Sequence, residues 1–364
     1  MRFFKISTYD WYILKKFMNT FFVMLFLFTL IIVIFDLAEK LEDFTSRQVP
    51  FKLIIFGYYV NFIPSILNAF SPIFVFLSVI FFTSKLAERS ELIAVLSGGV
   101  SYLRMARPYI IGALILVVLT YILNSWVIPI TDKKRVDFET EWIRNTKSEY
   151  KSDIHRQIEP GQYLYFRNFN HLDSTGQNVV VENFDSLKMT SRLYALSIRP
   201  AKEKGKWTLT NVVHKKFAND GSQEISTYNE LDTIIQFNPK DFFRRLDDIN
   251  SLNNTELKEY IKEKREIGAE DVNHYITEKY RRYAAPFSAL LLTLVGFSVS
   301  ARKSRGGVGV HLGKGILLSF LYMFLIKTFV TYGAQGSMNP IVAVWIPNII
   351  FGIIAWRLMV NAPK

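Results

Sequence analysis

The chain of 364 residues contains no cysteine. This excludes a disulfide framework, thiolate metal sites and cysteine nucleophiles. The chain also lacks the Gly-x-x-x-x-Gly-Lys-[Ser/Thr] run that binds nucleotide phosphates and the Gly-x-Ser-x-Gly elbow of serine hydrolases. Its five histidines show no metal-ligand spacing. We therefore expect a protein that is not an enzyme and that binds no metal or cofactor itself.

Long apolar runs are abundant, and 50% of the residues are hydrophobic. The run from Phe17 to Phe35 carries no charge and is long enough to cross a hydrocarbon core of about 30 Å. No small-residue cleavage site follows it, so we expect a retained span and not a signal peptide. The net charge of +12 arises largely beside such runs, which fits contact with anionic lipid and argues against nucleic-acid binding.

Six membrane-spanning helices are expected. Their approximate bounds are 17–35, 53–82, 109–128, 284–300, 312–333 and 341–359. Pro64 and Pro72 should kink or break the second helix, and Pro129 should end the third, because proline lacks a backbone donor. Short loops on one side are rich in Lys and Arg, whereas the loop 36–50 is acidic. Both termini should therefore be cytoplasmic.

Residues 131–275 are expected to form one domain on the outer side. This divides the chain into 1–130, with three helices, then 131–275, and then 276–364, with three further helices. The strand-like segments are 162–169, 178–184, 192–199, 206–213 and 233–237. Spaced short strands with turn residues between them predict a sandwich or a jelly roll. A helix over 254–267, closed by Gly268, should lead back to the membrane.

A charged segment, 84–101, lies between the second and third spans. Its apolar positions fall on one helical face: Leu92, Val95 and Leu96. Its charges lie elsewhere on the helix: Glu88, Arg89 and Glu91. Gly98 and Gly99 should stop this helix, and Ser101 should cap the next one. The pattern predicts a short amphipathic helix over about 84–98 at the membrane surface, continuous with the spans and suited to transmit a push from a soluble partner. An ordinary charged loop is the alternative.

Three segments carry a resemblance to a known family: 12–17, which leads into span one, 86–92 in the charged segment, and 278–287, which opens span four. They resemble the LptF/LptG family of lipopolysaccharide export permeases, over essentially the whole chain. The length and the span-one region favour the LptG branch. The resemblance implies an inner-membrane protein of mixed α and β class, with six transmembrane helices and a periplasmic β-jelly-roll-like domain between helices three and four.

The resemblance also implies partners. Such permeases pair with a paralogous subunit as a heterodimer and bind a cytoplasmic ATPase dimer, which carries the ATP and magnesium. Lipopolysaccharide enters between the subunits through gates formed by spans one and five, and passes on to a single-span, LptC-like jelly-roll partner. The coupling helix docks on the ATPase. The residue that matches the family's docking acid is Glu91, with Glu88, Arg89 and Leu92 as its neighbours.

Several residues are candidates for contact with the lipid. Lys327 inside span five either faces a cavity that holds lipid phosphates or snorkels to the interface. Span one has no lysine where the family often has one, so Lys40, Arg47 or Lys52 could replace it. Arg135, after span three, is either a headgroup contact or an interfacial anchor. Tyr163 and Tyr165 alternate with Leu164 and Phe166, so one pair could line an acyl groove while the other fills a core.

Two other function classes stay open. A mechanotransmitting ABC membrane subunit would use an ATPase without moving lipid, although that architecture usually has four spans. An ion-coupled secondary transporter would be expected to have paired intramembrane acids or inverted repeats, and neither is evident here.

Overall fold

The computed structural model describes residues 7–143, 150–170, 173–186, 188–201, 203, 205–218, 222–235, 237, 246–266, 268–269, 271–301 and 307–361. The chain divides into two compact units. The helical unit comprises Met1–Trp142, Asn250–Leu257 and Asn273–Lys364, and the sheet unit comprises Ile143–Ile249 and Lys258–Val272.

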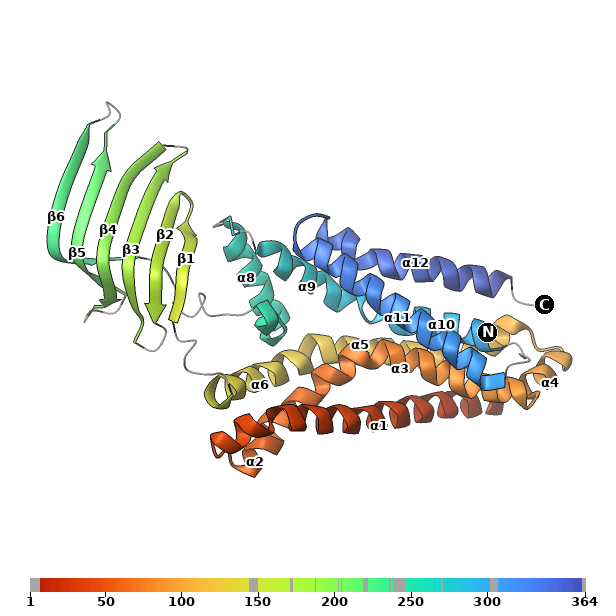
Figure 1. The fold of residues 1–364 in the computed structure, drawn as a ribbon. Helices are drawn as coiled ribbons and strands as arrows, with labels where there is room; N and C mark the ends of the chain where they lie inside the picture. Colours follow the sequence, from red (N-terminus) through yellow and green to blue (C-terminus); the bar gives the residue numbers. More distant parts are fainter. Residues whose placement is uncertain are drawn as a thin grey trace. The chain divides into compact units, whose positions relative to one another are not determined.

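The first half of the helical unit contains three long helical segments and one short helix. They are α1 (Thr8–Ser46); α2 (Phe51–Leu53) continuing through a π-helix (Ile54–Tyr59) into α3 (Val60–Glu88); α4 (Glu91–Ser97); and α5 (Tyr102–Ile122) continuing through a second π-helix (Leu123–Val127) into α6 (Ile128–Trp142). Ser7 and Asp10 form a capping box at the start of α1. Figure 1 shows α4 at the same end of the helical unit as the start of α1 and the end of α12.

The later helices complete this unit. They are α9 (Val272–Ala284), α10 (Phe287–Ser300), α11 (Gly307–Ala334) and α12 (Pro340–Val360). Before them in the chain come a 3-10 helix (Leu246–Ser251) and α8 (Asn254–Glu266), whose residues are divided between the helical unit and the sheet unit. Within the described residues, five helices are long and apolar enough to cross a membrane, or six if α9 and α10, bent by 50° at their break, count as one span. The structure therefore confirms the prediction of several helices able to span a membrane. The predicted number of six is reached only if α9 and α10 count as one span.

The effect of the prolines differs from the sequence prediction. The prediction that Pro129 ends the third helix is wrong, because α6 runs on to Trp142. Pro64 and Pro72 lie inside α3, so the second helix is not broken there, whereas the alternative of a kink stays a prediction. One π-helix (Leu123–Val127) shortly precedes Pro129 and another (Ile54–Tyr59) lies upstream of Pro64, and local π-helical adjustments are one way in which a membrane-spanning helix tolerates proline. On the same helix, Asn61 donates from its side-chain amide to the carbonyls of Phe56 and Gly57 in the upstream π-helix.

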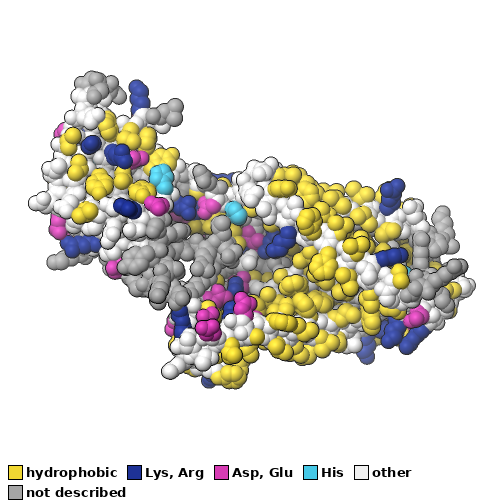
Figure 2. All heavy atoms as spheres, viewed as in Figure 1, with side chains coloured by type: hydrophobic (Ala, Val, Ile, Leu, Met, Phe, Trp, Pro, Cys, Tyr) yellow, Lys and Arg dark blue, Asp and Glu magenta, His cyan; other side chains and the backbone are white. Residues whose placement is uncertain are grey.

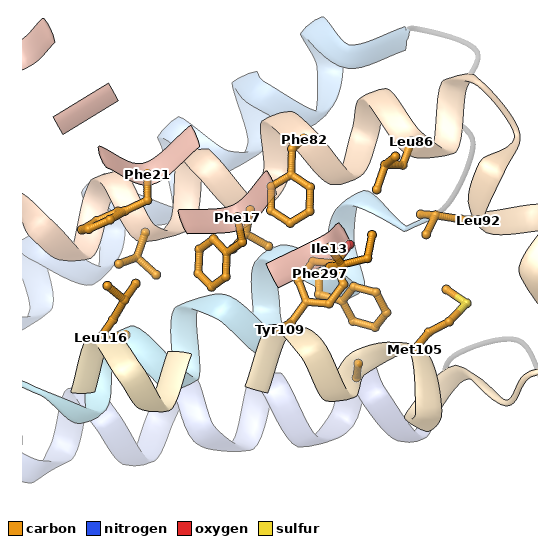
Figure 3. Close-up of a cluster of buried hydrophobic side chains, with 14 of the residues drawn as sticks. Ile13, Phe17, Phe21, Phe82, Leu86, Leu92, Met105, Tyr109, Leu116 and Phe297 are labelled. Atoms are coloured by element: carbon orange, nitrogen blue, oxygen red, sulfur yellow. The ribbon is translucent and has the colours of Figure 1, made fainter. Parts of the chain in front are cut away.

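A cluster of buried side chains holds the helices together near α4. It draws on α1, α3, α4, α5 and α10, and its largest members include Phe17, Phe82, Tyr109 and Phe297. Figure 3 shows these rings pointing toward one another from different helices. Outside this core, apolar side chains cover the visible face of the helices, with Lys and Arg near the end that carries α4 (Figure 2). A surface of this composition suits contact with hydrocarbon or with another membrane protein.

The sheet unit contains six antiparallel strands whose order in the sheet follows the chain. The strands are β1 (Tyr150–Glu159), β2 (Gln162–Asn170), β3 (Thr175–Asp185), β4 (Lys188–Pro200), β5 (Trp207–Phe217) and β6 (Gln223–Thr233). The jelly-roll topology is not confirmed, because the described strands form one meander. One face is apolar and buried, with Leu164, Phe166, Val179 and Leu209 at its centre.

The strand predictions are least accurate at the two edges of the sheet, where one predicted strand is wrong and two strands were not predicted. The segment 233–237 is wrong as a strand, because only Thr233 belongs to β6, whereas Ile235 and Phe237 pack on the apolar face. Strand β1 and most of β6 were not expected from the sequence. Both are edge strands, and their many polar residues hide the alternation that marks a half-buried strand. The helix predicted over 254–267 is confirmed as α8 over its described residues, and Gly268 follows it with a positive φ of 65°.

Candidate functional site

The charged segment after α3 contains a helix shorter than predicted. Residues 84–88 are the last turn of α3, and α4 begins only at Glu91, so one continuous helix over 84–98 is wrong. The physical reason is the backbone at Arg89 and Ser90, since Ser90 takes a left-handed conformation with φ of 59° that interrupts the helix. The predicted stop at Gly98 and Gly99 and the predicted cap at Ser101 are confirmed, and Ser101 Oγ accepts from the backbone N–H of Arg104.

The apolar side of α4 fixes this helix to the bundle. Leu92 is 1% exposed and belongs to the buried cluster that also contains Leu86 and Met105. Figure 3 shows Leu92 pointing from its helix toward these neighbours. Val95 and Leu96 are partly buried against the same cluster, as the predicted apolar face requires. Any force applied to α4 therefore acts on side chains packed directly against α3 and α5.

The other side of α4 is open. Glu88 and Arg89 are exposed, and Ile93 is 42% exposed. Glu91 is intermediate, with 37% of its side chain exposed; its Oε1 lies 4.0 Å from Arg89 Nη1, and its Oε2 accepts a hydrogen bond of 3.3 Å from the Tyr12 hydroxyl of α1. An exposed apolar residue with acidic and basic neighbours is a composition that suits a protein contact.

The basic residues that were predicted to contact lipid fall into two groups. Those of the first group form ion pairs with carboxylates of this chain. Lys40 bonds Asp36 at 2.9 Å and also donates to the Tyr58 hydroxyl. Arg135 donates to Asp132 at 3.2 Å and to Glu139 at 2.8 Å. The charges of Lys40 and Arg135 are therefore balanced by neighbouring carboxylates in this state.

Lys52 and Lys327 form the second group of basic residues that were predicted to contact lipid. Both side chains are exposed, and neither has an ion pair within the described part of the chain. Lys327 lines a cavity of about 130 Å³ between α3, α5 and α9 to α12. Arg281, Asn68, Ser71 and Tyr322 share this cavity. The structure thus places Lys327 beside other polar groups of the helical unit as well as at its surface.

A second polar cluster lies next to this cavity, and the ion pairing within it was not predicted from the sequence. Glu278 is almost fully buried and accepts from Arg281 at 2.7 Å and from Arg282 at 3.2 Å. A cavity of about 80 Å³ is lined by these three residues and by Asn68 and Asn124, which are hydrogen-bonded to each other at 3.0 Å. Buried charges near apolar spans are expensive and indicate a functional or structural requirement. In the sequence, Arg281 and Arg282 follow Glu278 by three and four positions, a spacing that brings side chains together on one face of a helix.

The tyrosines of β2 lie on the sheet face away from the apolar core. Leu164 and Phe166 are fully buried, whereas Tyr163 and Tyr165 are intermediate, so the alternation predicted for this strand is confirmed. Tyr163 stacks on the His155 ring at 5.9 Å and lies beside an open hollow of about 680 Å³. The Tyr165 hydroxyl donates to Asp153 at 2.8 Å, and this bond raises the pKa of Tyr165.

No group of three or more His, Asp or Glu side chains suited to a metal ion occurs among the residues that the structure describes. The absence of a bound cofactor stays a prediction.

Comparison with known proteins supports a single family. The family model described as "Lipopolysaccharide export system permease LptF/LptG" matches residues 11–361. Lipopolysaccharide export system permease protein LptG of Haemophilus influenzae is 26% identical, over 82% of this chain and 83% of that protein. The protein of the same name from Escherichia coli K12 is 21% identical, over 96% of this chain and 97% of that protein. The match extends across both the helices and the sheet, and the chain therefore belongs to the LptF/LptG family of lipopolysaccharide export system permeases.

Proposed function

We propose that this protein is the transmembrane subunit of an ABC transporter that extracts lipopolysaccharide from the inner membrane. A separate cytoplasmic ATPase dimer supplies the energy, a paralogous permease completes the transmembrane part, and an LptC-like protein with a single span receives the lipid. Both termini and α4 then face the cytoplasm, and the sheet unit faces the periplasm. ATP and magnesium belong to the ATPase.

The observation that supports this proposal best is the two-sided construction of α4. Leu92 is buried among residues of α3 and α5, while Glu91 and Ile93 of α4 remain accessible on the other side, as does Arg89, which precedes the helix. A helix that is packed into the spans and open to a partner can transmit a partner's movement to them. This is mechanical coupling between two conformational states, with no bond made or broken in this chain.

Contact with the lipid is proposed for the basic residues without ion pairs. The phosphates of lipopolysaccharide require cations, and Lys52 and Lys327 are exposed and free of carboxylates within the described residues. Lys40 and Arg135 would first have to leave Asp36 and Glu139, so they fit a later state of the transport cycle better.

The proposed gates are α1 and α11, the first and fifth spans. Both expose apolar side chains along their length, and these include Phe22, Phe26, Leu30 and Ile34 on α1 and Leu317, Phe320 and Phe324 on α11. On the sheet, Tyr163 and Tyr165 are accessible on the face opposite the apolar core, where they can meet a sugar or a partner, while acyl chains fit the apolar face better.

The test is photocrosslinking in cells, with one probe each at Glu91, Lys327 and Tyr163. We expect the ATPase at Glu91 and lipopolysaccharide at Lys327 and Tyr163. The matched control probe is Trp356, which is exposed on α12. An ATPase adduct without any lipid adduct would favour mechanotransmission, and the absence of both adducts would favour the secondary transporter.

A further inference from the structure

The start of α1 and the start of α4 are joined by a short chain of hydrogen bonds. Lys16 Nζ donates to the Tyr12 hydroxyl oxygen one turn away on α1, and its ammonium lies 4.4 Å from the centre of the Tyr12 ring. The Tyr12 hydroxyl in turn donates to Glu91 Oε2 at 3.3 Å. A cation on the phenol oxygen makes the hydroxyl proton a better donor, so Lys16 strengthens the bond from Tyr12 to Glu91.

The bond from Tyr12 selects which oxygen of Glu91 stays available. Oε2 faces Tyr12, whereas Oε1 lies 4.0 Å from Arg89 Nη1, beyond hydrogen-bond distance. Arg89 is itself exposed and can swing away. The carboxylate is therefore held at one oxygen and left open at the other, which suits an incoming guanidinium or ammonium group.

Both ends of this chain rest on the same packed core. Ile13 and Phe17, which flank Tyr12 and Lys16 on α1, are fully buried in the cluster that contains Leu92 of α4. Tyr12 itself is 42% exposed, so its hydroxyl lies at the surface while its helix is fixed. Packing therefore fixes the two helices that carry Tyr12 and Glu91, while the two side chains meet at the surface.

We propose that Tyr12 is a positioning residue for Glu91, and that Tyr12 and Lys16 extend the ATPase docking surface from α4 onto the first turns of α1. The partner group is a guanidinium or ammonium that pairs with Oε1 of Glu91. This inference rests on the proposed docking role of Glu91. Its consequence is that docking acts directly on α1, the helix that carries an exposed apolar stripe, as well as on α3 and α5.

The test uses the complete transporter, reconstituted with its paralogous subunit, in four forms: unchanged, Tyr12→Phe, Glu91→Gln and the double variant. The readouts are the ATPase concentration that gives half-maximal stimulated hydrolysis and the maximal rate. Tyr12→Phe keeps the ring and loses one hydrogen bond to a charged group, so we expect that concentration to rise about 3- to 10-fold with little change in maximal rate. In the Glu91→Gln form, adding Tyr12→Phe should change nothing further.

The matched control is Tyr332→Phe, which changes an equally exposed tyrosine on α11 and should leave both readouts unchanged. If Tyr12→Phe weakens docking equally with and without Glu91, Tyr12 acts by itself and the positioning role is wrong. If Tyr12→Phe has no effect while Glu91→Gln weakens docking, the positioning role is also wrong but the docking role of Glu91 stands. If Glu91→Gln has no effect, the docking role itself fails.

Discussion

Asp10 of α1 and Arg104 of α5 form a two-pronged ion pair beside the proposed docking surface. Arg104 Nη1 lies 2.6 Å from Asp10 Oδ1, and Nη2 lies 2.7 Å from Oδ2. Asp10 is 1% exposed and also accepts from the backbone N–H and the hydroxyl of Ser7. One carboxylate thus completes the cap of α1 and fixes that cap to the first turn of α5.

The first prediction concerns this pair. Arg104→Ala leaves the buried Asp10 carboxylate without its charged partner, and we expect a loss of about 2–3 kcal/mol in the free energy of unfolding, because the bonds from Ser7 remain. Thermal unfolding in detergent measures the change. The control is Arg199→Ala, which breaks an exposed pair with Glu230 and should cost less than about 1 kcal/mol. Equal effects of the two variants would contradict the structural role of Arg104.

The second prediction concerns Gly112, where α5 approaches α1. A Cβ at this position would lie 2.5 Å from Phe17 Cδ1 and 3.1 Å from Leu14 Cδ1. Phe17 is fully buried and cannot yield, so Gly112→Ala should destabilise the protein by about 1–3 kcal/mol through overpacking. Gly313→Ala on α11 is the control, since nothing lies within 4 Å of its Cβ. That variant should be neutral or slightly stabilising because alanine favours helix. Unfolding temperatures that fall equally for both would refute the prediction.

The third prediction concerns the bend between α9 and α10. Ser288 N–H bonds the carbonyl of Ala285, which leaves the carbonyl of Ala284 without its usual helical donor. Asn348 of α12 supplies one at 2.9 Å, and its own Oδ1 accepts from the Tyr322 hydroxyl at 2.8 Å. Asn348→Leu should therefore cost about 1–3 kcal/mol by leaving buried polar groups unpaired.

Tyr322→Phe serves as the comparison for Asn348→Leu, because it removes the bond to Asn348 Oδ1 but leaves the bond from Asn348 to the carbonyl of Ala284. Tyr322→Phe should lower the free energy of unfolding by about 0.5–1.5 kcal/mol, roughly half the effect expected of Asn348→Leu. Chemical unfolding of both variants measures the difference. If Tyr322→Phe costs as much as Asn348→Leu, the carbonyl of Ala284 is not what Asn348 serves.

Much of the fold was accessible from the sequence because it depends on long apolar runs and on local caps. The roles of Gly98 at the end of one helix and of Ser101 at the start of the next were predicted correctly, because a helix cap depends on residues within a few positions of it. The prediction of the end of the third helix was wrong, because the proline rule alone does not show that a helix continues past Pro129 after a π-helical turn. The strands β1 and β6 were missed for a related reason, as their pairing depends on neighbours and not on their own apolar content.

The candidate site likewise contains some features that follow from local sequence patterns and others that depend on residues far apart in the chain. The apolar face of α4 follows from spacing alone, and Leu92 is buried as expected. The pairing of Lys40 with Asp36 one turn away could also have been anticipated, since residues at this spacing face each other on a helix. The bond between Tyr12 and Glu91 joins residues 79 positions apart, and no local pattern in the sequence indicates it.

The last prediction tests Lys327 as a contact for lipid phosphate. This lysine lies in α11, lines a cavity with Arg281, and has no carboxylate partner within the described residues. If it binds phosphate, Lys327→Gln should lower the rate of lipopolysaccharide release from proteoliposomes about 3- to 10-fold, and Lys327→Arg should restore most of it, because the charge-assisted bond depends on a cation. The control is Lys262→Gln, which changes an exposed lysine of α8 that pairs with Glu266 and should leave release unchanged. If Lys327→Gln releases lipid at the normal rate, the side chain only snorkels to the interface. If Lys327→Arg is as slow as Lys327→Gln, the shape of the cavity and not its charge is what transport requires.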